Sequence, residues 1–145
     1  TRTTILRLTA TMSVAFVPKE MDFSSGTDAN MAQFSHLPIY IKTYEFIKFI
    51  YRIVQQFRKE YKYTLGAELQ QIIWQTVDEI IMTNSLPDNQ KKGGIEKISQ
   101  LFDKFKIRLR FAYEIGLLTD KKFGIAQKEM EEIGKMIGGW SKWAV

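Results

Sequence analysis

From Pro38 to the C-terminus, apolar residues recur every three or four positions, and this spacing most limits how the chain can fold. Such a period puts apolar side chains on one face of a helix. Four stretches carry it, at residues 46–61, 69–81, 98–113 and 123–140. Because short segments separate them, the pattern predicts an all-α fold, an antiparallel up-down four-helix bundle over residues 37–145.

The helix ends are marked by residues that start or stop helices. Pro38 suits a first turn, so the first helix is expected to begin there and run for about six turns. Thr64 and Gly66 interrupt the period, and Thr64 is expected to cap the second helix. The segment 83–93 has no apolar period and predicts the longest loop. The third helix is expected to end near Gly116 and the fourth to begin around Thr119.

Residues 1–36 differ from the rest and predict an N-terminal extension or linker that is extended or disordered. Apolar and polar residues alternate over 4–17, as in a half-buried strand, and residues 19–35 contain many small polar residues. A lone strand could pair with another copy, lie on the bundle or stay mobile. Because Met31 directly precedes the bundle, residues 1–30 are interpreted as an upstream extension without a functional role.

The composition argues against catalysis and against bound metal. The chain has no cysteine and one histidine, His36, which lies in the expected linker. A di-iron bundle would need Glu-x-x-His pairs, and none occurs. Phosphate-binding glycine motifs are also missing. We therefore expect a protein that is not an enzyme, has no cofactor or metal, does not bind membranes and works in the cytoplasm.

The formal net charge is +5, and residues 1–37 carry three basic and three acidic side chains, so the whole excess lies in the bundle. Helical spacing gathers the basic residues into stripes. One stripe, on the first helix, contains Lys48, Arg52, Lys59 and Lys62. Two more, on the third helix, contain Lys97, Lys104 and Arg108, and Lys106 with Arg110. Such stripes suit phosphate contacts, although a solvated outer face would show the same pattern.

Two further features concern self-association. Ile107 and Phe111 lie four apart on the third helix, opposite its core face, so another surface is needed to bury them. On the fourth helix Gly134, Gly138 and Ser141 form a row of small residues, which allows another backbone to approach. The row could serve tight packing inside one bundle, but the exposed apolar pair favours a homo-oligomer.

Three segments together resemble one known family. They are residues 61–66 (YKYTLG) between the first two helices, 107–118 (IRLRFAYEIGLL) at the end of the third, and 131–140 (EEIGKMIGGW) in the fourth. The chain resembles, over residues 37–143, the four-helix-bundle family that contains accessory variability determinants of diversity-generating retroelements and proteins encoded in 23S ribosomal RNA intervening sequences.

The resemblance implies more than the composition does. Accessory variability determinants form homopentameric barrels with a basic surface, bind the element's reverse transcriptase, and associate with RNA and DNA during mutagenic retrohoming. By position in the third-helix segment, Arg108 and Arg110 are the first candidates for nucleic-acid or reverse-transcriptase contact, followed by Lys104 and Lys106. The expected partners are therefore the reverse transcriptase, RNA, an RNA–DNA hybrid or DNA, and further copies of the chain. The host would be a bacterium, an archaeon or a phage.

Two alternatives stay open at this point. The intervening-sequence relatives have the same bundle, and a protein of that branch could bind ribosomal RNA. An oligomeric scaffold, whose charge only keeps it in solution, would also fit the residue pattern. The motifs do not separate these from the retroelement interpretation.

Overall fold

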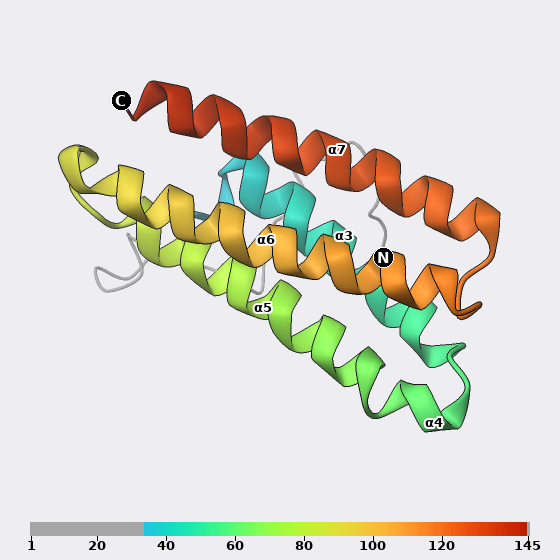
Figure 1. Cartoon of the computed structure of the whole chain (residues 1–145). Helices are drawn as coiled ribbons and strands as arrows, with labels where there is room; N and C mark the ends of the chain where they lie inside the picture. Colours follow the sequence, from blue (N-terminus) through green and yellow to red (C-terminus); the bar gives the residue numbers. More distant parts are fainter. Residues whose placement is uncertain (1–33, 145) are drawn as a thin grey trace.

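The computed structural model describes residues 34–144, and the regular secondary structure of this part of the chain is all helical, without a strand. Four long helices dominate it: α3 (Pro38–Gln55), α5 (Leu65–Asn84), α6 (Lys91–Glu114) and α7 (Asp120–Trp143). A short helix, α4 (Lys59–Lys62), precedes α5, and a 3₁₀ turn, η3 (Asp88–Gln90), precedes α6. The long helices run alternately up and down (Figure 1). The predicted four-helix bundle is confirmed, whereas the strand expected at 4–17 lies outside the described residues.

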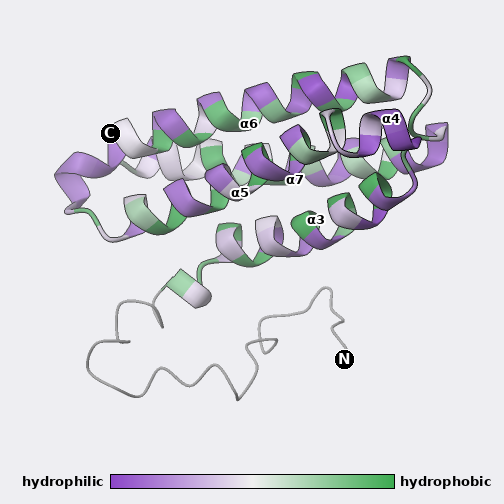
Figure 2. Ribbon diagram, turned by 90° about the horizontal axis from the view of Figure 1, so that it is seen from below, coloured by the Kyte–Doolittle hydropathy of each residue, from purple (hydrophilic) through white to green (hydrophobic). Residues whose placement is uncertain are grey.

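Each long helix packs against two neighbours. α3 and α6 both contact α5 on one side and α7 on the other. Apolar and polar residues alternate around every helix (Figure 2), because only the inward face of each is covered. Aromatic rings fill the centre, where Phe46 of α3 meets Phe105 of α6 edge to face with ring centroids 5.6 Å apart. This rigid core fixes which side chains face outward.

The end of the third helix and the start of the fourth agree with the prediction. α6 ends at Glu114 and is followed by Gly116, whose φ of 90° suits a residue without a side chain. α7 begins after Thr119, whose hydroxyl oxygen accepts a hydrogen bond from the Lys122 N–H at 3.1 Å. This is an N-cap, and it stabilises the start of α7.

The prediction of one six-turn first helix is wrong. α3 ends at Gln55, and Arg58 has an extended backbone (φ −58°, ψ 147°) before α4 begins. The cause is packing: a side chain on Gly66 would come within 2.6 Å of a methyl group of Val54, so α5 starts directly against α3. To place Gly66 against Val54, the chain has to leave α3 after Gln55, although the apolar period continues to residue 61.

Two other predictions about the connections are wrong. Thr64 precedes α5, but its hydroxyl donates to the Glu60 carbonyl oxygen at 3.0 Å and caps no N–H group. The loop expected at 83–93 is mostly helical, since α5 runs to Asn84 and α6 starts at Lys91. The buried Lys91 ammonium donates to carbonyl oxygens at the end of α5, among them Asn84 at 2.8 Å, and this shortens the connection.

Candidate interaction surface

The outward side of α6, called here the α6 outer face, consists of Lys104, Lys106, Ile107, Arg108, Arg110 and Phe111. Its two apolar residues are open to solvent, with Ile107 68% and Phe111 52% exposed. The buried residues of the same helix, such as Phe105 and Leu109, point the other way. The expectation that Ile107 and Phe111 lie outside the core is confirmed. An uncovered apolar pair within a charged surface is typical of an interaction site.

The basic residues of α6 mostly pair with nearby carboxylates. Arg108 Nε lies 3.1 Å from Glu68 Oε1 of α5, and Lys97 Nζ lies 3.5 Å from Glu79 Oε1, also of α5. Within α6 the pairs are Lys106 with Asp103 at 3.2 Å and Arg110 with Glu114 at 3.1 Å. Lys104 has no carboxylate within 4.0 Å among the described residues. Exposed pairs of this kind are weak, so a polyanion can replace the carboxylates.

The stripe predicted on the first helix is divided by the turn at residues 56–58. Lys48 and Arg52 lie on α3, whereas Lys59 and Lys62 lie on α4. Lys48 also contacts the neighbouring Glu45 at 2.9 Å. The structure therefore divides the four residues between two separate helices.

The small residues of α7 do not serve packing inside the bundle. A Cβ atom built on Gly134 or Gly138 would meet no atom of the described chain within 4 Å, apart from the helix itself. Gly138 is exposed, and Gly134 and Ser141 are half-buried. Tight packing within one bundle is thus wrong as an explanation for this row. The backbone of α7 is instead open to approach from outside.

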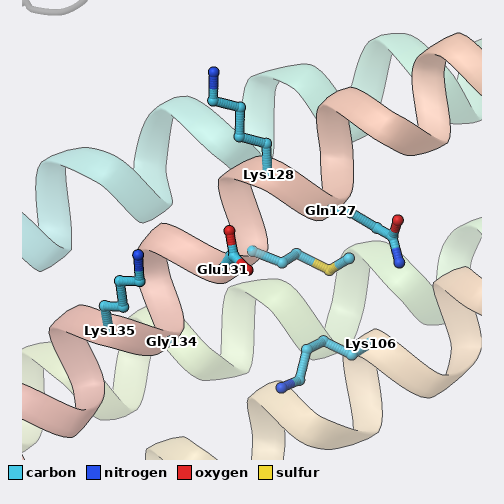
Figure 3. A pocket seen from close by; sticks show the side chains of 7 residues that line it. Lys106, Gln127, Lys128, Glu131, Gly134 and Lys135 are labelled. Atoms are coloured by element: carbon cyan, nitrogen blue, oxygen red, sulfur yellow. The ribbon is translucent and has the colours of Figure 1, made fainter.

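A shallow groove runs between α6 and α7 and holds basic residues that the sequence interpretation missed. Lys106 lines it from α6, and Lys128, Glu131, Gly134 and Lys135 line it from α7, together with Gln127 and Met130. Figure 3 shows Lys128 and Lys135 extending from the same side of α7, with Glu131 between them. A seven-residue repeat of lysine in α7 is the signal that could have revealed them.

The opposite side of α7 is held against α3 by a charge cluster. Lys42 Nζ of α3 lies 2.7 Å from both Glu129 Oε1 and Glu132 Oε1. Burial lowers the pKa of Lys42, but the hydrogen bonds to the two glutamates outweigh this and raise it overall. The bond from Lys42 in turn lowers the pKa of Glu132. Lys42 therefore binds two carboxylates of α7, and the charges of Lys128 and Lys135 lower the pKa of Glu132 further.

Metal clusters and membrane-spanning helices are both absent from residues 34–144. No group of three His, Cys, Asp or Glu side chains there could hold a metal ion. In the same part of the chain, no helix is long and apolar enough to cross a membrane.

Comparison with known proteins gives one result. A family model described as bAvd-like matches residues 37–144 of the chain, which include all four long helices. No curated protein matches the sequence. The match covers the bundle and the three segments on which the resemblance rests.

Proposed function

The chain belongs to the bAvd-like family, and we propose that it is the accessory protein of a diversity-generating retroelement. In this role it binds the element's reverse transcriptase and RNA or DNA, and it supports mutagenic retrohoming without a catalytic step of its own. Further copies of the chain assemble with it into a homo-oligomer, which we propose is a pentamer.

The α6 outer face is the observation that carries this proposal. Four of its six residues lie in the segment 107–118 that resembles the family, and it combines an exposed apolar pair with four basic side chains. Apolar residues surrounded by charge suit a protein interface, and Arg in particular pairs with phosphate oxygens. One surface thus offers contacts both for a protein partner and for a nucleic-acid backbone.

Reversing the charge of both arginines, Arg108→Glu with Arg110→Glu, is expected to weaken binding to an RNA–DNA hybrid about tenfold or more. The slope of log affinity against log salt should also become shallower by about two, since roughly 0.9 of slope goes with each lost phosphate contact. Fluorescence anisotropy across a salt series measures both quantities.

The matched control reverses Arg58 and Lys92, two exposed basic residues outside the proposed contacts. This control has the same net charge as the test variant, so it separates a local contact from general attraction. Helix content by circular dichroism checks that both variants fold. Equal affinity of the two variants would refute the assignment of Arg108 and Arg110.

The oligomer rests on the apolar pair and on the open backbone of α7. Phe111→Asp places a charge in the apolar contact, so it is expected to shift the protein from several times 16.9 kDa to the monomer mass in light scattering. Tyr63→Asp is the control, because Tyr63 is also an exposed aromatic residue, 71% exposed, but lies before α5. A wild-type monomer at micromolar concentration would contradict the oligomer.

A further inference from the structure

We draw no further inference here: the strongest candidate, the exposed aromatic patch between α3 and α5 in which the Trp74 indole N–H donates to the Tyr51 hydroxyl oxygen at 2.8 Å, carries none because nothing in the described part of the chain shows what covers it.

Discussion

Replacing Phe105 with alanine is expected to lower the free energy of unfolding by about 3–5 kcal/mol. Phe105 is 0% exposed and lies between two other rings, Phe46 at 5.6 Å and Phe102 at 6.4 Å between centroids. The substitution removes apolar contacts of α6 with α3 and leaves a cavity that these large rings cannot close by small movements. Since domains are stable by about 5–15 kcal/mol, most of the margin is at stake.

The matched control for this prediction is Phe111→Ala, which removes the same ring from the same helix. Phe111 is 52% exposed, so in the dissociated chain its loss should cost about 0.5 kcal/mol or less. Urea unfolding at concentrations below the association range measures both variants. A loss of under about 1 kcal/mol for Phe105→Ala would mean that the described core is not the real one.

The core of the bundle could be predicted because its signal is local and repeated. Every turn of α6 places an apolar residue on the same side, and Ile98, Phe102, Phe105 and Leu109 are all buried as their spacing requires. The exposure of Ile107 and Phe111 follows from the same periodicity, because these residues lie on the opposite side of α6. Where the outcome depends only on a residue's angle around its own helix, sequence periodicity is sufficient.

The connections could not be predicted because they depend on contacts between helices. Phe57 and Tyr61 continue the apolar period, yet α3 ends at Gln55 so that Gly66 can pack against Val54. Lys91 reads in the sequence as one more surface charge, but it is buried and binds carbonyl oxygens at the end of α5. Neither contact produces a periodic pattern in the sequence.

The sequence predicts only part of the candidate site, because it does not show which charged side chains form ion pairs. Spacing alone places Arg108 and Lys97 on one stripe, but it cannot show that Glu68 and Glu79 of α5 lie opposite them. Lys128 and Lys135 of the groove belong to a seven-residue lysine repeat that is visible in the sequence. Only the structure shows that Glu132, which binds Lys42 of α3, also lies near these two lysines.

Two neighbouring glycines of α6 provide a test of how closely α5 and α6 pack. A Cβ atom on Gly94 would overlap the hydroxyl oxygen of Thr83 and come within 2.9 Å of its methyl group, whereas a Cβ atom on Gly93 would meet nothing within 4 Å. Thr83 is 0% exposed, and its branched side chain is stiff. Replacing either glycine with alanine gains the same helix propensity. The two variants therefore differ only in the space available for the new methyl group.

Gly94→Ala is therefore expected to lower the free energy of unfolding by about 1–3 kcal/mol, while Gly93→Ala should raise it by up to about 1 kcal/mol. Thermal and urea unfolding give both values. Thr83→Ala removes the two nearest of the three Thr83 atoms that meet the new methyl group, and the Thr83 hydroxyl has no hydrogen-bond partner to lose among residues 34–144. Adding Thr83→Ala to Gly94→Ala should thus recover stability, a coupling that only direct contact produces. If both glycine variants were stabilised alike, α5 and α6 would have to lie farther apart than the structure places them.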